Sequence, residues 1–164
     1  MIKTGISGKE MNIISYLELE NKRFFTRSDI KQFFKNKNEM NVYIHKLKIK
    51  GRVIKLNKDK YYLVPIKAYQ TNWSEHPFII VDEIFNGQGY FIGGKAAAHY
   101  WKHIEQIPSV TDVYTTKKQG EKKILGCSIR YRRTTKKNMR SFVKKVVNGH
   151  AFIIADKKRS LSWK

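Results

Sequence analysis

The sequence predicts an α+β chain in two parts, a helix-rich N-terminal part that ends in a hairpin and a small mixed α/β part behind it. Three observations carry this prediction. Residues 1–66 hold three stretches with helical spacing before two β-rich runs. Residues 72–164 instead alternate short apolar runs with turns. The chain has 164 residues, of which 41% are hydrophobic, so each part has material for a core.

The N-terminal part is predicted to begin with a helix over residues 9–19, where apolar side chains recur at helical spacing. Two phenylalanines at 24 and 25 suggest a short strand. The following run from Thr26 to Asp29 has the pattern of a capping box, in which a hydroxyl and a carboxylate three residues later bond free N–H groups. It predicts a second helix that ends near residue 34.

A third helix is predicted over residues 39–50, with Asn38 as its N-cap and Gly51 as its stop. Its inner face is formed by Met40, Tyr43, Ile44 and Leu47. Beyond it, residues 53–56 and 61–64 flank a polar turn, which is a hairpin signal. Three helices followed by a hairpin is the order of the winged helix-turn-helix.

A helix that lies in the major groove of DNA needs polar outer side chains for base edges and cations for phosphates. The third helix offers both, and its predicted DNA contacts are Asn38, Asn41, Val42, His45, Lys46 and Lys48. Further phosphate or minor-groove contacts are predicted in the second helix and in the hairpin, or wing, at Arg27, Lys55, Lys58 and Lys60. The alternative is an ordinary solvated helix face beside a lysine-rich surface turn.

The second part is predicted to begin with a helix over residues 77–85, because a proline suits a first helical turn. A turn over residues 86–89 leads to a strand over 90–92, and Gly93-Gly94 opens a helix over 95–104. The remaining predicted elements are a strand over 110–115, a basic loop over 117–123, strands over 124–125 and 128–133, a hairpin with strands over 144–147 and 150–154 around Asn148-Gly149, and a last helix capped by Asp156.

Positive charge dominates the composition. Lys and Arg number 34 against 13 Asp and Glu, which gives a net charge of +21. The excess is shared, since residues 1–67 hold 16 basic and 6 acidic residues and residues 68–164 hold 18 and 7. A compact body with this charge repels itself, and nucleic acid is the usual polyanion that relieves the repulsion, with membrane surfaces as the rival class.

The residues from 117 to 145 form the densest basic stretch, with twelve cations and one acid. The sequence predicts a second basic surface there, formed by Lys117, Lys118, Lys122, Lys123, Arg130, Arg132 and Arg133. Such a surface neutralises phosphates, receives an acidic protein partner or serves solubility, and these alternatives stay open.

Three enzyme interpretations have little support. The run from Gly89 to Ala96 has phosphate-loop spacing, but an alanine replaces the magnesium-binding hydroxyl and the middle is strand-like. His99 and His103 share a helix face without a third metal ligand. The best rival is a magnesium-dependent nuclease that uses Asp112, Glu121 and Lys123, although Glu121 follows a glycine in an expected turn. We therefore expect no enzyme activity, no cofactor and no metal.

A single cysteine, Cys127, excludes an intrachain disulfide and a cysteine zinc cluster. The first residues lack the apolar stretch of a signal peptide, and no apolar run is long enough to cross a bilayer. We expect a cytoplasmic protein that does not enter membranes.

The second part resembles the AbiEi antitoxin family of abortive-infection systems. The resemblance rests first on residues 90–101, Tyr-Phe-Ile-Gly-Gly-Lys-Ala-Ala-Ala-His-Tyr-Trp, which match the family's strand and Gly-led helix. Residues 105–108 with 113–118, and residues 154–161, are similar to its next two segments. The resemblance covers nearly the whole chain, the winged helix included.

The resemblance implies a repressor that binds operator DNA and is the antitoxin of a nucleotidyltransferase toxin, with a second domain that counters the toxin. Two features depart from the family. Lys158 stands at a usual glutamate position, and the sequence ends where other members continue, so the second domain is expected to be a shortened form. The alternative is a stand-alone winged-helix regulator without a toxin.

Overall fold

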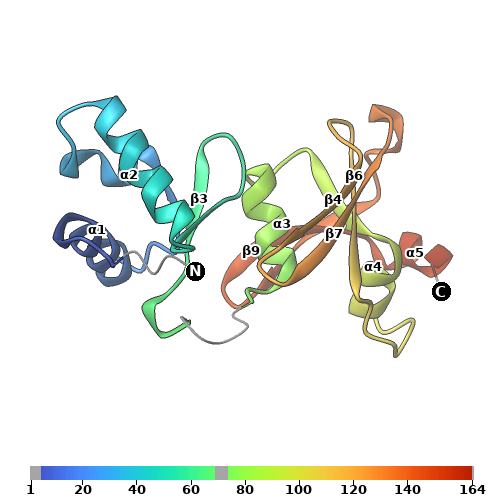
Figure 1. Cartoon of the computed structure of the whole chain (residues 1–164). Helices are drawn as coiled ribbons and strands as arrows, with labels where there is room; N and C mark the ends of the chain where they lie inside the picture. The colour runs from blue at the N-terminus through green and yellow to red at the C-terminus, as the bar shows by residue number, and fades with distance from the viewer. Residues whose placement is uncertain (1–4, 69–73, 164) are drawn as a thin grey trace. The chain divides into compact units, whose positions relative to one another are not determined.

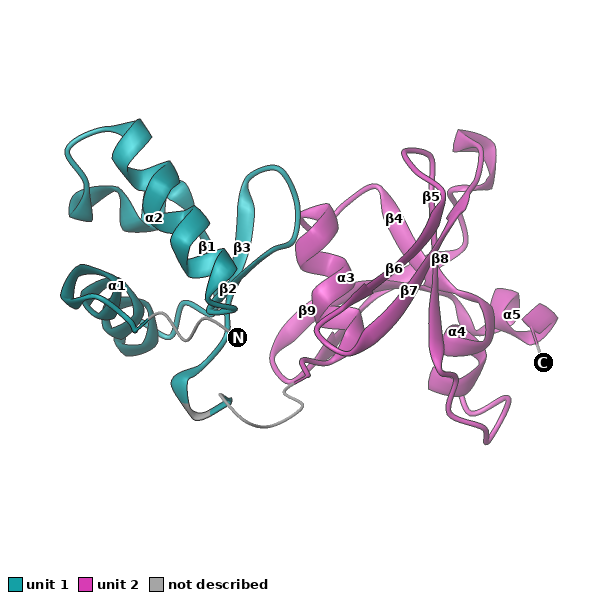
Figure 2. Cartoon of the chain, viewed as in Figure 1, with its two compact units in different colours: residues 1–72 teal, residues 73–164 magenta. Residues whose placement is uncertain are grey.

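The structure is a computed structural model that describes residues 5–68 and 74–163. It divides into two compact units, Met1–Asn72 and Trp73–Lys164 (Figures 1 and 2). The fold is α+β, as the sequence predicts, since helices and sheets occur in both units.

The N-terminal unit follows the predicted order of elements. Its helical segments are α1 (Gly8–Leu19), the 3-10 helix η1 (Arg27–Phe33) and α2 (Lys37–Ile49). Its strands are β1 (Phe24–Thr26), β2 (Val53–Lys55) and β3 (Lys60–Leu63), which form an antiparallel sheet in the order β1-β3-β2. A short 3-10 turn, η2 (Ile66–Ala68), follows the sheet.

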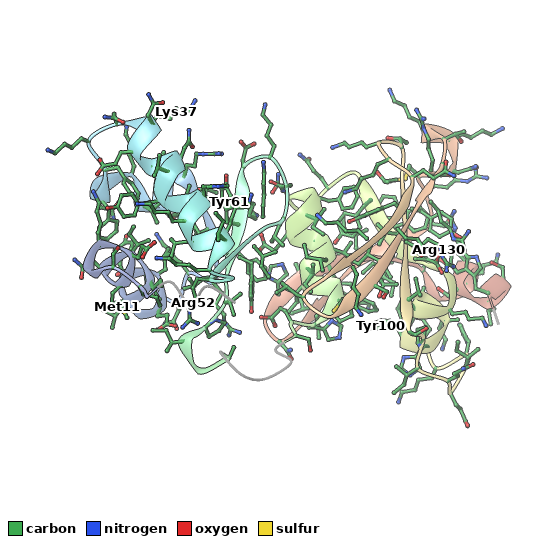
Figure 3. The ribbon with its side chains drawn as sticks, viewed as in Figure 1. Met11, Lys37, Arg52, Tyr61, Tyr100 and Arg130 are labelled. Carbon is green, nitrogen blue, oxygen red and sulfur yellow. The ribbon has the colours of Figure 1, made fainter. Side chains whose placement is uncertain are left out.

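The core of this unit is apolar and is shared by all three helical segments. Ile13, Ile14 and Leu17 of α1 are fully buried. They pack in one cluster with Ile30 of η1, the inner face of α2, and Tyr61 of β3, which Figure 3 labels. Burial of apolar side chains at helical spacing therefore fixes which face of α2 points inward and which faces solvent.

The second unit contains a six-stranded mixed sheet in the order β6-β7-β5-β4-β9-β8. Its strands are β4 (Tyr90–Gly93), β5 (Val110–Thr115), β6 (Gly120–Ile124), β7 (Cys127–Arg133), β8 (Phe142–Val147) and β9 (His150–Ala155). The pairs β4–β9 and β5–β7 are parallel, and the other pairs are antiparallel. Its helical segments are α3 (Pro77–Phe85), α4 (Gly94–Tyr100), η3 (Lys136–Asn138), α5 (Lys157–Ser160) and η4 (Leu161–Trp163).

The two faces of this sheet differ. On one face, Phe78 and Phe85 of α3 contact the rings of Phe152, Tyr90 and Tyr131. Because registered residues on neighbouring strands point the same way, the opposite face carries the row Glu121, Arg130 and Asp112, with Tyr114 and Arg132 beside it. We call this second side the arginine face.

Three predicted boundaries are wrong. The N-cap of α2 is Asn36, whose side chain accepts a hydrogen bond from Glu39 N at 2.9 Å, so Asn38 lies inside the first turn. Helix α4 ends at Tyr100 rather than residue 104, because Lys102 takes a φ of 60° and His103 N returns to Ala98 O at 2.8 Å. Residues 120–123, predicted as loop, form strand β6 against β7.

Candidate nucleic-acid interface

The outer face of α2 is exposed as predicted. Asn38, Asn41, Val42, His45 and Lys48 are all exposed, while Met40, Ile44 and Leu47 on the opposite side are buried. Val42 is 51% exposed and places a methyl-bearing side chain among polar ones. This face therefore offers hydrogen-bonding groups, one cation and one apolar contact to a partner.

Lys46 differs from the other predicted contacts on α2. Lys46 is exposed, but its ammonium lies over the Tyr43 ring, 5.0 Å from the ring centroid. Tyr43 is half-buried and packs against the core, so Lys46 lies on the flank of the helix rather than on the outer face. Its position suits a phosphate beside the helix better than a base edge.

Arg27 connects α2 with the hairpin turn. Its Nε donates a hydrogen bond to Asn41 Oδ1 at 3.3 Å, and its Nη1 donates to Lys58 O at 3.4 Å. Its guanidinium also lies over the Tyr61 ring, 5.3 Å from the centroid. One arginine thus contacts the predicted recognition helix, the predicted wing and a buried ring of the core, and it holds a cation between the helix and the turn.

The contact with Arg27 changes what Asn41 offers. Because the amide oxygen of Asn41 accepts the arginine hydrogen bond, one of its two lone pairs remains for a ligand, beside the donors of the amide nitrogen. In the major groove, these donors pair with N7 or O6 of guanine, N7 of adenine or O4 of thymine. The bidentate adenine contact typical of asparagine would share the oxygen with Arg27.

The start of η1, which positions Arg27, is fixed by Asp29. Its carboxylate accepts bonds from Thr26 N at 2.7 Å, Thr26 Oγ1 at 2.8 Å and Lys22 Nζ at 3.0 Å. The predicted capping box is therefore confirmed. Burial raises the pKa of Asp29, but the bonds from Thr26 and Lys22 outweigh it and hold the pKa below its ordinary value.

The hairpin turn is built by Asn57, whose Oδ1 accepts bonds from Asp59 N and Lys60 N, both at 2.9 Å. Lys55 and Lys58 are exposed on this hairpin, and Lys60 is half-buried. An asparagine that bonds the backbone two and three residues ahead gives the turn a fixed shape. The two exposed lysines are thus carried by an ordered turn.

A basic hollow that sequence reasoning missed lies between η1 and α2. It is a cavity of about 320 Å³ lined by Arg27, Ser28, Lys31, Phe34, Lys35, Asn36, Lys37 and Met40. Four of these residues are cations and none is acidic. Lys37 stands at the N-terminal end of α2 (Figure 3). The signal available in the sequence was the spacing of three lysines at 31, 35 and 37, which brackets the turn between the two helices.

Glu10 ties α1 to α2 on the side away from this hollow. It is fully buried, and Lys50 Nζ contacts its two carboxylate oxygens at 2.6 and 2.9 Å. Glu10 also accepts a bond from Ser7 N at 2.7 Å, which completes a capping box on α1. Burial raises the pKa of Glu10, but the bonds from Lys50 and Ser7 outweigh it and lower the pKa overall.

The predicted second basic surface is not one continuous patch. Arg130, Arg132 and Lys123 lie on the arginine face, because they share register positions with Asp112, Tyr114 and Ser128. Lys122 and Arg133 register with Ile129 and Thr115 on the face that α3 covers. Lys117 and Lys118 follow β5 in a loop. The strand period of two therefore divides a basic run between two surfaces.

Lys118 is held differently from a solvated lysine. Its ammonium lies 3.9 Å from the Tyr131 ring centroid and 4.7 Å from that of Phe85. Burial lowers the pKa of Lys118, and the positive charges of Lys122 and Lys117 lower it further. This lysine therefore packs on the α3 side of the sheet rather than facing a partner.

The acidic residues of the nuclease alternative are bridged by arginines. Asp112 Oδ1 accepts from Arg132 Nε at 2.7 Å and lies 3.7 Å from Arg130 Nη1, while Glu121 pairs with Arg130 Nε. Glu121 lies in strand β6, so its expected position in a turn is wrong. Among the described residues, no group of three or more His, Cys, Asp and Glu is arranged to hold a metal ion.

The two other sequence motifs, the phosphate-loop-like run and the histidine pair, lie in and beside the elements β4 and α4. The middle of the phosphate-loop-like run is the buried strand β4, as the sequence indicates. His103 Nε2 lies 3.1 Å from Lys157 O, which ties α4 to α5, and His99 is half-buried.

In comparisons with known proteins, no family model and no curated protein sequence matches this chain. Across residues 5–68 and 74–163, no helix combines the length and apolarity that a membrane crossing requires.

Proposed function

We propose that the N-terminal unit is a winged-helix domain that binds duplex DNA, and that the protein is a DNA-binding transcriptional regulator. The observation that carries the proposal is Arg27, whose bonds to Asn41 and Lys58 hold a cation between α2 and the β2–β3 turn. In a winged helix these two elements approach the duplex together, the helix in the major groove and the wing along the backbone.

The order of elements supports the winged-helix assignment. Three helical segments precede the β2–β3 hairpin, and β1 pairs with β3 to close a three-stranded sheet. Helix α2 stands in the place of the recognition helix. Asn41, His45 and Val42 on its exposed face are then the base contacts, since amide, imidazole and methyl groups read donors, acceptors and the thymine methyl.

The basic hollow supplies the phosphate contacts. In this arrangement the N-terminal end of a recognition helix faces the duplex, and four cations there neutralise backbone charge. Lys55 and Lys58 of the wing add further cations, and the hydrogen bonds of Arg27 to Asn41 and Lys58 O connect the wing turn with α2 and the hollow. The unit therefore places phosphate-binding cations in the hollow and on the wing, beside the base-reading face of α2.

The finer proposal is that this regulator is a repressor and the antitoxin of a nucleotidyltransferase toxin. It rests on the resemblance of residues 90–101, 105–108, 113–118 and 154–161 to AbiEi antitoxins. The alternative is a stand-alone regulator with the same DNA-binding unit. A neighbouring open reading frame for a nucleotidyltransferase, and loss of that enzyme's toxicity when this protein is co-expressed, would distinguish the first from the second.

The test of DNA binding is a fluorescence anisotropy titration of labelled duplex from the protein's own promoter region. Arg27→Lys keeps the charge but removes the planar fork that reaches Asn41 and Lys58 together, so we expect weaker binding and lower preference for promoter over random DNA. The matched control is Lys158→Arg, an exposed exchange in the second unit. Unchanged affinity and preference for Arg27→Lys would contradict the proposal.

The same preparation tests the nuclease alternative. Supercoiled plasmid incubated with the protein and magnesium should stay intact. Cleavage that is lost in Asp112→Asn and in Glu121→Gln would make the second unit a nuclease and would overturn the proposal that the protein acts only by binding.

A further inference from the structure

The arginine face of the six-stranded sheet contains a polar cavity of about 470 Å³. Its lining includes Lys95, Arg130 and Arg132 as cations, Asp112 as the acid, and Tyr114 and Trp163 as aromatic side chains. These residues come from α4, β5, β7 and η4, so four elements far apart in the sequence build one site. Arg130 is labelled in Figure 3. Cavities of this volume accommodate ligands of nucleotide size.

Two glycines allow the floor of this cavity to form. A Cβ at Gly93 would lie 2.6 Å from the Tyr114 ring, and a Cβ at Gly94 would lie 2.5 Å from Asp112 Oδ2. Gly94 also takes a φ of +60°, which disfavours other residues. Any side chain at either position would displace Tyr114 or Asp112 from the lining.

Carboxylates orient the two arginines of the cavity. Asp112 accepts from Nε of Arg132, and Glu121 pairs with Nε of Arg130. Both contacts use the inner nitrogen, and Arg130 Nη1 also lies 3.7 Å from Asp112 Oδ1, so the remaining terminal nitrogens carry the donors that a ligand would use. A guanidinium held in this way loses little side-chain entropy when it binds a phosphate with two parallel hydrogen bonds.

An aromatic wall stands beside these cations. The rings of Tyr114 and Trp163 are stacked with centroids 5.6 Å apart, and Tyr114 stacks in turn on Phe91 at 5.0 Å. Trp163 is half-buried, so part of its ring is accessible to solvent. A tryptophan presented next to phosphate-binding cations is suited to stack on a base.

A second cavity of about 500 Å³ adjoins the first. It is lined by Tyr114, Gln119, Gly120, Glu121, Arg130, Tyr131, Arg132 and Arg133. It shares Tyr114, Arg130 and Arg132 with the first cavity, so the two hollows meet at the arginines. Two hollows that share the same arginines suit a chain with more than one nucleotide better than one free nucleotide.

We propose that the arginine face binds single-stranded nucleic acid, with backbone phosphate on Arg130, Arg132 and Lys95 and one base against Trp163. The other sheet face is covered by α3, whereas on the arginine face α4 and η4 pack beside β5 and leave the side chains of Arg130 and Arg132 37% and 45% exposed. A sheet face that presents aromatic and basic side chains is a recognised way to bind unpaired bases, which splay and stack on the sheet. The activity is distinct from duplex binding by the N-terminal unit.

The experiment uses the full chain and a fluorescein-labelled deoxythymidine dodecamer, followed by anisotropy. Lys95→Glu should weaken binding about tenfold more than Lys158→Glu. Both lysines are exposed residues of the second unit and both changes alter the net charge equally, but only Lys95 lines the cavity. Binding by the N-terminal unit is the same in both variants and cancels in the comparison.

A second readout is specific to the base stacked on Trp163. The unlabelled dodecamer should quench part of the tryptophan emission of the wild-type chain, and Trp163→Leu should lose that quenching together with about tenfold in affinity. Equal binding by Lys95→Glu and Lys158→Glu, or undiminished quenching in Trp163→Leu, would overturn the proposal. Thymidine monophosphate that competes as well as the dodecamer would overturn it too, by showing a site for a free nucleotide.

Discussion

The basic hollow beside α2 in the N-terminal unit and the arginine face of the second unit both gather cations, but they hold them differently. The charge excess of the two halves of the chain is nearly equal. In the basic hollow beside α2, four cations gather without an acid in the lining. On the arginine face, the carboxylates of Asp112 and Glu121 pair with Nε of the two arginines, Arg132 and Arg130 respectively.

This difference has a physical consequence. Cations that outnumber the acids around them raise the local potential and attract any phosphate backbone over a long range, so they suit rapid and salt-sensitive binding to a duplex. Arginines held by carboxylates contribute less net charge but a fixed geometry, so they suit a short-range contact with one phosphate. Equal net charge therefore does not imply equal use.

The largest expected effect concerns salt. If the N-terminal unit contacts roughly six phosphates, its affinity for duplex DNA should fall about a thousandfold between about 50 and 200 mM salt. Lys35→Glu with Lys37→Glu should remove much of that affinity and flatten the salt dependence, because both residues line the basic hollow. The measurement is duplex binding by anisotropy across a salt series.

The matched control for this salt series is the pair Lys157→Glu and Lys158→Glu, which changes the charge equally on an exposed helix of the second unit. A flat salt titration of the wild-type protein, or equal loss in the two double variants, would show that the α2 side has no special role.

The next effect separates specificity from affinity on α2. Asn41→Ala or His45→Ala should reduce preference for promoter over random duplex by about 1–3 kcal/mol. Lys58→Ala should weaken binding to both duplexes alike, because a wing lysine contacts backbone. Competition titrations with the two duplexes measure the difference. If all three variants lose affinity equally on both duplexes, α2 does not read bases.

The contact between Arg27 and Asn41 sharpens this prediction. Arg27→Ala removes the hydrogen bond that competes for the amide oxygen of Asn41, so both lone pairs of that oxygen become available for a bidentate contact with adenine. Selection from a randomised duplex pool should therefore shift toward adenine at one position. An unchanged base preference in Arg27→Ala would show that this contact does not determine what Asn41 reads.

The two units also differ in how much of their structure can be predicted from the sequence. In the N-terminal unit, local signals were sufficient: the helical spacing, the Thr26–Asp29 capping box and the polar hairpin turn gave each element and the outer face of α2. The N-cap was misplaced by two residues because Asn36 and Asn38 are both good caps, and only the chain path into α2 decides between them.

In the second unit, the elements were predictable but the site was not. The parallel pairing of β5 with β7 brings Asp112 beside Arg130 and Arg132, and no local pattern encodes that pairing. The predicted basic surface joined residues that are neighbours in sequence, whereas the strand period sends alternate residues to opposite faces. Lys95 and Trp163 reach the cavity only through the tertiary fold.

A smaller effect tests the frame of the N-terminal unit. Glu10→Gln should lower the free energy of unfolding at neutral pH by about 2 kcal/mol, because it removes one partner of a buried ion pair with Lys50. The pKa of Glu10 is lowered in the folded state, so its stabilisation is present above the unfolded pKa and is lost as pH falls through the folded one. Urea unfolding at several pH values should show the wild-type advantage shrinking in acid.

The control for this pH dependence is Glu20→Gln, an exposed residue at the C-terminal end of the same helix, and the stability of this variant should track the wild type. An advantage for Glu10 that persists unchanged in acid would show that shape rather than charge stabilises this contact.

The smallest expected effect lies in the second unit and concerns two buried tyrosines. Tyr131 is 5% exposed, and its hydroxyl is the buried side-chain oxygen that has no hydrogen-bond partner among the described residues. Tyr90 is 1% exposed, but its hydroxyl donates to Asp82 Oδ1 at 2.7 Å and accepts from Ile153 N at 3.0 Å. A buried hydroxyl without a partner costs free energy, whereas one with two partners does not.

Replacement by phenylalanine should therefore have opposite signs at the two positions. Tyr131→Phe should raise the free energy of unfolding by about 1 kcal/mol, and Tyr90→Phe should lower it by about 1–2 kcal/mol. Burial raises the pKa of Tyr131 to about 12, so the wild-type chain loses stability as pH rises from about 10 toward that value. Tyr131→Phe removes this loss, and its advantage should widen in alkaline solution. Denaturant titrations of both variants measure the signs, and a destabilising Tyr131→Phe would mean that the hydroxyl has a partner in solution.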